Sequence, residues 1–149
     1  EYVLPRDTAW FGDPDTSYVY SGIMNEPIPW TKTLMELKLK VEDFTHCNFN
    51  SLLINKYETG KDKVGWHADD EKELGQNPTI ASVSLGGTRD FQLRPKDKSR
   101  ETITLPLIGG SLILMQPPTQ RFWEHQIPPR SKIDLPRLNL TFRLTNQTQ

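Results

Sequence analysis

The stretch Arg137–Arg143, "RLNLTFR", alternates polar and apolar side chains from end to end. Side chains at positions i and i+2 of a β-strand point to the same face of a sheet. The stretch therefore predicts a strand with an apolar face and a polar face, the latter formed by Arg137, Asn139, Thr141 and Arg143. A solvent-exposed face is the simpler interpretation. However, two arginines with no acid beside them are unusual on such a face.

Similar short runs follow one another from residue 49 onward, divided by Gly, Pro, Asn and Asp. These runs are "FNSLLINKY", "TIASVSL", "RDFQLRP", "ETITLPL" and "SLILMQ". Their spacing is typical of an all-β sandwich or barrel rather than of alternating strand–helix units. We therefore expect a mainly β (α+β) fold with a double-stranded β-helix, or jelly-roll, core. A small Greek-key barrel is the alternative.

The segment before residue 49 has a different character. "PWTKTLMELKLKVEDF" (29–44) predicts a helix that begins near a proline. Four apolar residues lie roughly along one side of this helix: Leu34, Leu37, Leu39 and Val41. Before it, "AWFGDPDTSYVYSG" (9–22) indicates a hairpin, or a loop followed by a short strand. We expect this part to form an N-terminal lid.

The length and composition are those of an ordinary globular domain. With 149 residues, 35% hydrophobic and 25% charged, the chain can bury a real core. No apolar run is long enough to cross a membrane, and no signal peptide is recognisable. We expect a single domain over residues 1–149, with a lid and supporting helix in residues 1–48 and the jelly-roll core in residues 49–149.

The termini and the cysteine count indicate the setting of the protein. The chain starts at Glu1 rather than at a methionine, so we expect it to be a fragment or a trimmed chain. Cys47 is the single cysteine, which excludes an internal disulfide and suits a reducing compartment, cytoplasmic or nuclear. The net charge of −1 argues weakly against a polyanionic partner, although local patches can override the total.

Three histidines are the candidate metal ligands. In "VGWHADDE" (64–71), His67 and Asp69 are spaced so that a strand would point both side chains at one place, and His125 follows a later apolar run. Two histidines and one carboxylate form the facial triad that leaves three positions of iron(II) open. Zinc hydrolases use similar ligands, and the pattern alone is weak. His46, at the end of the predicted helix, fits a capping or surface residue.

The arginine face of "RLNLTFR" is a candidate carboxylate site. Arg137 and Arg143 would have Cα atoms roughly 20 Å apart, a gap that two long side chains reaching inward reduce to the length of a small dicarboxylate. Arginine binds carboxylates with a bidentate fork. Asn55 and Tyr57, which share a face of "LLINKY", could donate hydrogen bonds to the same acid.

Taken in order, these motifs resemble the AlkB family of iron(II)- and 2-oxoglutarate-dependent dioxygenases. The resemblance covers nearly the whole chain and rests on "NKY" (55–57), "HADD" (67–70), "ASVSLG" (81–86), His125 and "RLNLTFR". Each motif is common, but the ordered set is specific. The resemblance implies a jelly-roll fold, iron(II), the cosubstrates 2-oxoglutarate and O₂, and oxidative removal of alkyl groups from nucleobases. Formaldehyde, succinate and CO₂ would be the products.

The resemblance also implies roles for individual residues. His67, Asp69 and His125 match the iron ligands of the family. Five residues match its 2-oxoglutarate contacts: Asn55, Tyr57, Arg137, Asn139 and Arg143. Among them, we expect Arg137 at the distal carboxylate and Arg143 nearer the metal.

Aromatic residues are candidates for holding a base. An enzyme that acts on a ring nitrogen cannot reach it inside a duplex, so the base must be flipped out or single-stranded. The candidate walls of its pocket are Trp10, Tyr18, Tyr20 and Trp66, and "YVYS" (18–21) resembles the nucleotide-recognition segment of the family. Ordinary packing is the alternative, above all for Trp66.

Charged residues are candidates for substrate recognition. Asp70 matches an acid that contacts the damaged base, and a carboxylate there would favour cationic 1-methyladenine or 3-methylcytosine over a neutral base. The alternative is that Asp70 only pairs with Arg89 or Arg94. Arg89 is itself a further candidate for substrate contact. Two basic groups are candidates for phosphate contact or, equally, for solvated loops: "RPKDKSR" (94–100), and the lysines Lys56, Lys61 and Lys63.

The function expected from these features is oxidative demethylation of N-alkylated nucleobases. The expected partner is alkylated DNA or RNA, with no membrane, and the protein is expected to be a monomer. Two alternatives remain open: a related dioxygenase that acts on protein or another substrate, and a catalytically silent nucleic-acid-binding module on the same fold.

Overall fold

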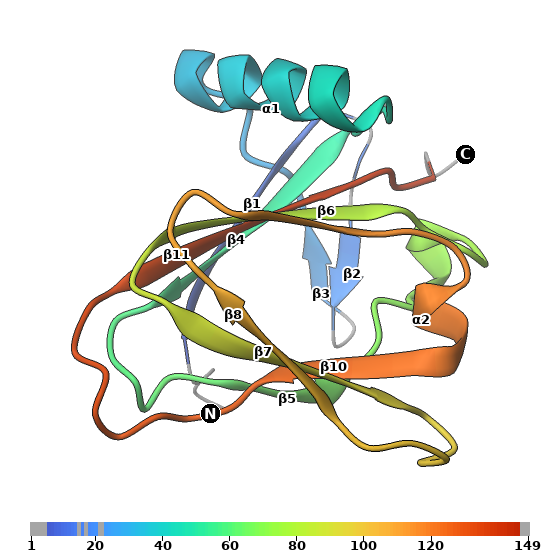
Figure 1. Cartoon of the computed structure of the whole chain (residues 1–149). Coiled ribbons are helices and arrows are strands. Elements are labelled where there is room, and N and C mark those ends of the chain that lie inside the picture. Colours follow the sequence, from blue (N-terminus) through green and yellow to red (C-terminus); the bar gives the residue numbers. More distant parts are fainter. Residues whose placement is uncertain (1–5, 15, 17, 21–22, 147–149) are drawn as a thin grey trace.

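Two β-sheets face each other, and one long helix covers the outer side of one of them (Figure 1). The computed structural model describes residues 6–14, 16, 18–20 and 23–146, and the side chains among them except those of residues 18–25. Within these ranges, no helix combines the length and the apolar character needed to cross a bilayer. The mainly β fold with facing antiparallel sheets confirms the predicted jelly roll.

The major sheet has five antiparallel strands in the order β1-β4-β11-β6-β9. Their bounds are Asp7–Gly12, Ser51–Tyr57, Arg137–Arg143, Ile80–Gly86 and Leu112–Met115. The stretch "RLNLTFR" forms β11, the central strand, and Asn139 pairs with Asn55 of β4 on one side and with Ser84 of β6 on the other. The predicted alternation is therefore confirmed: Leu140 and Phe142 face the helix, and the polar residues face the second sheet.

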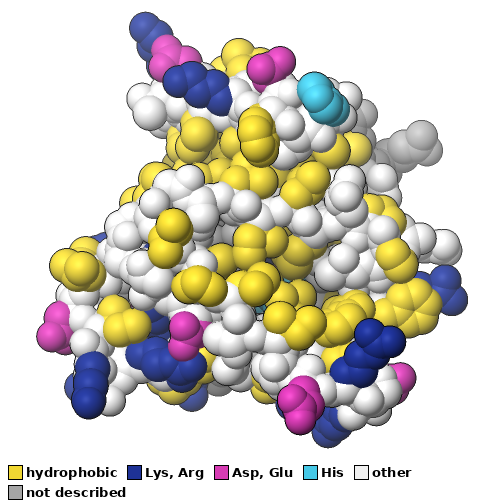
Figure 2. Space-filling view, in the orientation of Figure 1, with side chains coloured by type: hydrophobic (Ala, Val, Ile, Leu, Met, Phe, Trp, Pro, Cys, Tyr) yellow, Lys and Arg dark blue, Asp and Glu magenta, His cyan; other side chains and the backbone are white. Residues whose placement is uncertain are grey.

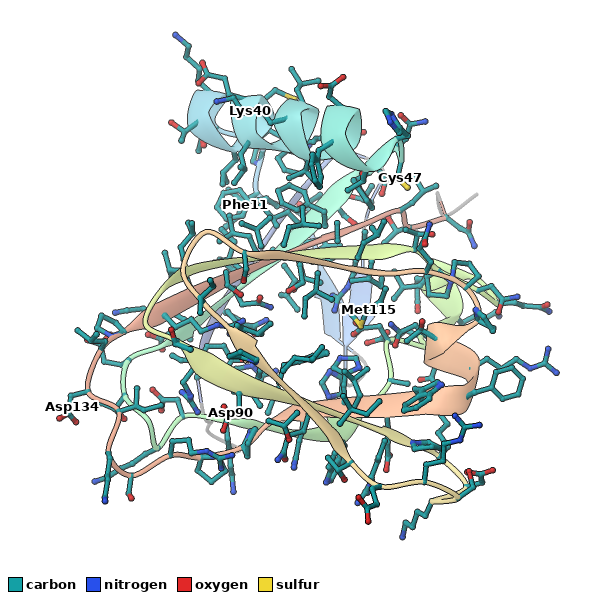
Figure 3. All side chains as sticks on the ribbon, in the orientation of Figure 1. Phe11, Lys40, Cys47, Asp90, Met115 and Asp134 are labelled. Carbon is teal, nitrogen blue, oxygen red and sulfur yellow. The ribbon has the colours of Figure 1, made fainter. Side chains whose placement is uncertain are left out.

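The minor sheet has four antiparallel strands in the order β5-β10-β7-β8. Their bounds are Val64–His67, Trp123–Ile127, Arg89–Pro95 and Ile103–Leu107. Apolar side chains of both sheets meet between them, among them Ile80, Phe91, Met115 and Ile127. In Figure 3, Met115 lies in this space between the sheets. A short 3-10 helix, η1 (Lys72–Leu74), and the one-turn helix α2 (Thr119–Phe122) complete the core.

Helix α1 (Lys32–Thr45) packs on the outer face of the major sheet (Figure 1). It begins after Thr31, whose hydroxyl accepts the Leu34 N–H at 3.2 Å. Leu34, Leu37 and Val41 contact the sheet, and Phe11 lies beneath them (Figure 3). The expectation for Leu39 was wrong, since it is 56% exposed. Leu39 is two residues from Leu37 and two residues from Val41. Its side chain is therefore rotated by about 200° from each of theirs around the helix axis.

His46 ends α1 as predicted for a capping or surface residue. Its backbone has the left-handed conformation, with φ of 55°, and its side chain is exposed. It takes no part in the group formed by the other two histidines, which lie between the sheets. The choice between metal ligand and cap is therefore decided for this residue by its place in the fold.

The expected boundary between lid and core at residue 48 does not match the sheet. β1 pairs with β4 over its full length, from Asp7 opposite Lys56 to Gly12 opposite Ser51, so the jelly-roll sheet begins in the segment expected to be lid. Outside both main sheets lies the small hairpin of β2 (Tyr18–Tyr20) and β3 (Ile23–Asn25). Helix α1 is thus inserted between two neighbouring strands of one sheet.

Candidate functional site

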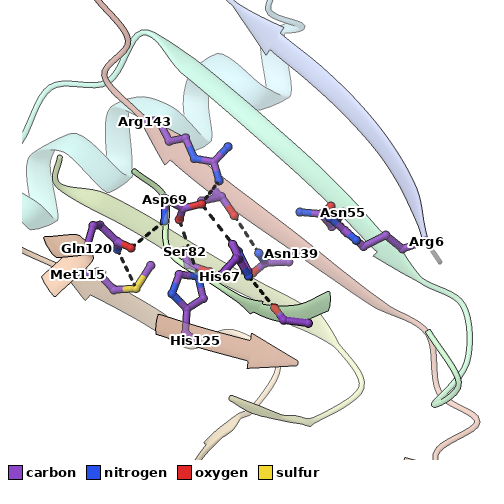
Figure 4. Close-up of polar contacts among 12 residues, drawn as sticks. Arg6, Asn55, His67, Asp69, Ser82, Met115, Gln120, His125, Asn139 and Arg143 are labelled. Atoms are coloured by element: carbon purple, nitrogen blue, oxygen red, sulfur yellow. Dashed lines mark hydrogen bonds and ion pairs between the residues drawn. The ribbon is translucent and has the colours of Figure 1, made fainter. Parts of the chain in front are cut away.

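His67, Asp69 and His125 converge at one point between the sheets (Figure 4). One ligand atom from each residue lies within 4.8 Å of the others. Each carboxylate oxygen of Asp69 is 3.9 Å from a histidine Nε2, Oδ1 from that of His67 and Oδ2 from that of His125. Two imidazoles and one carboxylate at this separation form the donor set of an iron(II) facial triad.

A β-bulge brings the first histidine into this group. His67 is opposite His125, whereas Val64 is opposite Ile127, so β5 has one residue more than β10 over the same interval. The extra residue lets both Val64 and His67 face the pocket, which regular alternation would forbid. The reason given for pairing His67 with Asp69 was therefore incomplete. β5 ends at His67, and Asp69 reaches the site from the following loop.

The side chain of Gln120 holds that loop in place. Gln120 is 2% exposed on α2, and its Oε1 accepts the backbone N–H of Asp69 at 2.9 Å. Its Nε2 donates to the Met115 Sδ at 3.4 Å. Both polar groups of the amide are thus used inside the protein, and the position of Asp69 is set by α2, directly before the strand that carries His125.

Arg143 holds the metal-binding carboxylate in its charged form. The Asp69 side chain is almost fully buried, and the Arg143 Nη2 donates to its Oδ1 at 2.8 Å. Burial by itself would raise the pKa of Asp69, but the charges of Arg143, His125 and His67 and the Arg143 hydrogen bond outweigh it. They hold the pKa below its ordinary value of 3.8. Asp69 is therefore an anionic ligand throughout the physiological range.

His125 is neutral at physiological pH. Burial lowers the pKa of its imidazole from 6.5 to about 4; Asp69 opposes this shift, and the charges of His67 and Arg143 add to it. A neutral imidazole has a free nitrogen lone pair, which is the form that binds a metal. The protein thus presents His125 ready to coordinate, without a proton to displace.

This pKa predicts how the metal-free protein responds to acid. In the unfolded chain His125 takes up a proton near pH 6.5, but in the folded protein it does so only near pH 4. Neutral His125 therefore contributes fully to the free energy of unfolding above pH 6.5, and this contribution is lost as the pH falls to about 4. We expect a loss of about 3 kcal/mol in the free energy of unfolding over this window. Urea titrations of metal-free protein at several pH values measure it.

The matched variant is His125→Gln, which has no titrating group at this position. Between pH 6.5 and 4, the free energy of unfolding of this variant is expected to fall less than that of the unmodified protein. The difference between the two decreases is the contribution of His125. Carboxylates that lie away from His125 titrate equally in both proteins and cancel in the comparison, and the pKa of Asp69 lies below this window. Parallel pH profiles for the two proteins would contradict a depressed pKa of His125.

A pocket beside the metal ligands brings together all five residues matched to 2-oxoglutarate contacts. The major sheet provides Asn55, Tyr57, Arg137, Asn139 and Arg143 to its wall. The minor sheet provides His67, Phe91, His125 and Ile127 to the opposite wall. One wall of the pocket therefore has two arginines, and the opposite wall has two of the metal ligands.

Arg137 has unused donors deep in this pocket. The residue is 1% exposed, and its Nη2 donates to the Ser84 Oγ and the Asn139 Oδ1, both at 3.0 Å. Its Nε and Nη1 are buried and have no hydrogen-bond partner among the described residues. Burial also lowers the pKa of Arg137 below its ordinary value. A bound carboxylate would satisfy the two donors and balance the charge.

Tyr57 and Arg143 extend the same anion site. The ring of Tyr57 lies 5.2 Å from the guanidinium carbon of Arg137, and burial raises the pKa of Tyr57, partly offset by the charge of Arg137. Its hydroxyl therefore stays protonated and can donate. Arg143 has a buried Nε with no partner among the described residues, while its Nη2 binds Asp69. This contact fits the expectation that Arg143 lies toward the metal.

Several residues of the pocket were not predicted. Arg6 donates from its Nε to the Asn55 Oδ1 at 2.7 Å, and Ser82 donates to the Asn139 Oδ1 at 2.7 Å. Ser82 lies within the quoted motif "ASVSLG", and its alternation with Ser84 could have marked it. Arg6 and Gln120 have no local signal, because they lie outside any regular alternation and meet the site only through the fold.

The two described aromatic residues that were predicted to hold a base, Trp10 and Trp66, do not line this pocket. Trp10 is 9% exposed in β1, and its indole N–H donates to the Thr16 carbonyl at 3.2 Å. It shares a face with Leu53 of the pocket but does not itself line the pocket. Trp66 lies within the bulge, and the guanidinium carbon of Arg94 is 4.0 Å from its ring centre. The side chains of Tyr18 and Tyr20 lie outside the described residues.

Arg89 has a structural role, which corrects the expectation that it contacts substrate. It is 1% exposed, and its guanidinium donates to the backbone carbonyls of Thr59, Asp62 and Pro128 at 2.7 to 3.2 Å. These carbonyls belong to two loops, the one between β4 and β5 and the one after β10. An arginine from β7 with carbonyl partners on both loops fastens them together.

Asp70 is exposed and forms an ion pair with a lysine, not with Arg89 or Arg94 as the sequence suggested. Its Oδ2 accepts a hydrogen bond from the Lys96 Nζ at 2.9 Å, whereas Arg94 pairs with Glu124. Lys96 follows β7 directly, so the ion pair joins the loop after the metal ligands to the β7–β8 turn. Glu71, the next residue, is half-buried.

Comparison with known proteins accounts for this combination of triad and buried arginines. Residues 1–143 match the model of the "2OG-Fe(II) oxygenase superfamily". The chain belongs to this superfamily. Its relatives place it among AlkB proteins, as the sequence motifs predict. They include DNA oxidative demethylase ALKBH2 of Mus musculus, 42% identical over 147 residues, and alpha-ketoglutarate-dependent dioxygenase alkB homolog 3 of Mus musculus, 44% identical over 151 residues.

The extent of these matches differs between the chain and its relatives. The matches cover 94% and 95% of this chain but only 62% and 52% of the two relatives. Among solved structures, that of OsALKBH1 superposes with a TM-score of 0.66 at 20% identity, over 94% of this chain and 78% of the other. This likeness supports the jelly-roll fold. The cofactors of the superfamily are iron(II) and 2-oxoglutarate with O₂, and the donor set described above fits them.

Proposed function

We propose that the protein is an iron(II)- and 2-oxoglutarate-dependent dioxygenase that removes alkyl groups from nucleobases such as 1-methyladenine and 3-methylcytosine in DNA or RNA. The observation that carries this proposal is the coexistence of a His67–Asp69–His125 triad with a buried, partly unpaired arginine at the far end of one pocket. A binding module without catalysis would have no use for either feature. The intracellular, reducing setting expected from Cys47 suits iron(II).

Each residue of the site has a defined task in this proposal. The metal is held by His67, by His125 in its neutral form and by Asp69 in its anionic form. Arg143 keeps Asp69 ionised. Arg137 and the protonated Tyr57 hold the distal carboxylate of 2-oxoglutarate. Phe91 and Ile127 form the apolar part of the wall and exclude water. With metal, cosubstrate and O₂ bound, the centre supplies the oxidant that converts an N-methyl C–H to C–OH, and the resulting hemiaminal loses formaldehyde.

The direct test is turnover on methylated oligonucleotides of DNA and of RNA in parallel, with iron(II), ascorbate and 2-oxoglutarate. With oligonucleotides that have 1-methyladenine or 3-methylcytosine, we expect formation of formaldehyde and succinate. With unmodified oligonucleotides, we expect no formaldehyde. Succinate without formaldehyde would mean a dioxygenase with another substrate, such as protein. Release of neither product, with iron and 2-oxoglutarate bound, would contradict the proposed activity.

The carboxylate of Asp70 is proposed to favour cationic bases. Asp70→Asn keeps the shape and removes the charge, so turnover of cationic 3-methylcytosine should fall more than that of a neutral alkylated base. Because Asp70 is exposed and already paired with Lys96, we expect a change of about two- to fivefold in this preference. The ratio of kcat/KM for the two oligonucleotides measures it.

Glu71→Gln is the matched variant, since it removes the neighbouring charge. Uncoupled conversion of 2-oxoglutarate to succinate, without nucleic acid, should be unchanged in Asp70→Asn. An equal loss on cationic and neutral bases would show that Asp70 maintains the loop and does not recognise charge. A shift in preference in Glu71→Gln alone would assign the role to that neighbour.

A further inference from the structure

Helix α2 ends in an exposed arginine–phenylalanine pair near the metal ligands. Phe122 is 52% exposed, and the guanidinium carbon of the exposed Arg121 lies 5.1 Å from its ring centre. His125 follows three residues later in β10. None of the tasks assigned so far uses this pair. An exposed aromatic ring with a cation against it is typical of a binding surface.

Three contacts place the pair at the rim of the metal site. Gln120, on the same turn as Phe122, holds the N–H of Asp69 at 2.9 Å. The Phe122 carbonyl accepts the Lys96 N–H at 2.8 Å, and the Lys96 side chain binds Asp70 at 2.9 Å. The turn of α2 therefore joins both the loop that carries Asp69 and the β7–β8 turn.

The surroundings of the pair are cationic as well as aromatic. The β7–β8 turn that contacts Phe122 has exposed Lys96, Lys98 and Arg100, and Arg121 adds a fourth exposed cation. Three exposed acids lie among these cations: Asp97, which accepts the Ser99 N–H at 2.9 Å, Asp70, which pairs with Lys96, and Glu101 after Arg100. Figure 2 shows hydrophobic, basic and acidic side chains next to each other at the lower right, over α2 and this turn in the orientation of Figure 1. Such a combination complements a nucleotide, which has a flat base and a charged phosphate.

We propose that Arg121 and Phe122 form a stacking platform for a nucleotide that neighbours the damaged one in single-stranded nucleic acid. The neighbouring base stacks on the ring of Phe122, and Arg121 with the lysines of the β7–β8 turn contacts the phosphates. This inference rests on the proposed function and extends it to the flanking strand. It also predicts tolerance of sequence, since every base has a π-face and the platform has no groups that recognise base edges.

The test compares Phe122→Ala with Phe44→Ala. Phe44 is 76% exposed on α1, on the far side of the major sheet, and is the matched control. Stacking of one base corresponds to a factor of about five or more in affinity. We therefore expect Phe122→Ala to weaken binding of a single-stranded methylated oligonucleotide, DNA or RNA, at least about fivefold by fluorescence anisotropy. Phe122→Trp should restore it, and Phe44→Ala should match the unmodified protein.

Abasic nucleotides distinguish stacking from a general loss of structure. An oligonucleotide with abasic residues on both sides of the methylated base lacks the stacking partner, so Phe122→Ala should bind it as well as the unmodified protein does. An equal loss on normal and abasic oligonucleotides, or a loss no larger than in Phe44→Ala, would overturn the platform. In turnover assays the effect should lie in KM and not in kcat.

Binding and turnover separate this inference from the proposed function. If the unmodified protein releases no formaldehyde from any methylated oligonucleotide, the proposed demethylation fails. Anisotropy still decides the platform in that case, since it needs no catalysis. If the unmodified protein demethylates but Phe122→Ala binds normally, only the platform fails.

Discussion

Replacing His67 with alanine is expected to abolish iron binding and to lower formaldehyde release by about 100-fold or more. His67 provides one of three ligands, and two ligands alone hold iron(II) poorly. The fold should survive, because the side chain is 37% exposed at the end of β5 and its loss leaves no closed cavity. Calorimetric titration with iron(II) under anaerobic conditions measures the binding, and circular dichroism checks the fold.

His46→Asn is the control for this experiment. His46 is exposed in the left-handed conformation at the end of α1, and asparagine tolerates that conformation. Metal binding and turnover should therefore equal those of the unmodified protein. Full activity in His67→Ala would contradict the assignment of the triad, whereas loss in both variants would indicate an indirect effect.

Replacing Arg137 with methionine is expected to weaken 2-oxoglutarate binding by about 30-fold or more. Methionine keeps much of the length but removes the Nε and Nη1 donors that have no partner among the described residues. Loss of one side of a buried charge pair costs about 2 to 5 kcal/mol. Iron binding should not change, because Arg137 touches none of the three ligands. Competition binding of 2-oxoglutarate to the metal-loaded protein measures the effect.

Arg143→Met and Arg130→Met are the comparison variants for Arg137→Met. Arg143 binds Asp69 directly, so its replacement should weaken iron binding as well as 2-oxoglutarate binding. Arg130 forms a half-exposed ion pair with Asp90, and its replacement should affect neither. Unchanged affinity of Arg137→Met for 2-oxoglutarate would mean that the arginine has only a structural role.

The central strand was predictable because its signal is local. Alternation within "RLNLTFR" assigns each residue of β11 to a face, and Leu140 and Phe142 of the apolar face are buried under α1. The polar face could be matched to "LLINKY" for the same reason, since β4 pairs with β11 in register, Asn55 opposite Asn139. Regular strands with one apolar face leave little freedom of register.

Features that depend on an irregularity or on distant contacts were not predictable. The bulge in β5 shifts the alternation by one residue, so His67 faces the pocket and Trp66 packs against Arg94. Arg89 looks like any exposed arginine in the sequence. Its partners lie 27 to 39 residues away in the chain, and only the fold brings their carbonyls together. The place of β1 in the sheet was missed because its pairing partner β4 follows a whole helix later.

The position of β11 has a consequence for the order of assembly during synthesis. The strand lies between β4 and β6, both of which leave the ribosome long before it. Until Arg137–Arg143 emerges, those two strands have unpaired edges, which are prone to bind other chains. Because this strand also provides Arg137 and Arg143 of the pocket, closing the sheet and completing the anion site are one event. A nascent chain halted before it therefore has neither a finished major sheet nor a finished site.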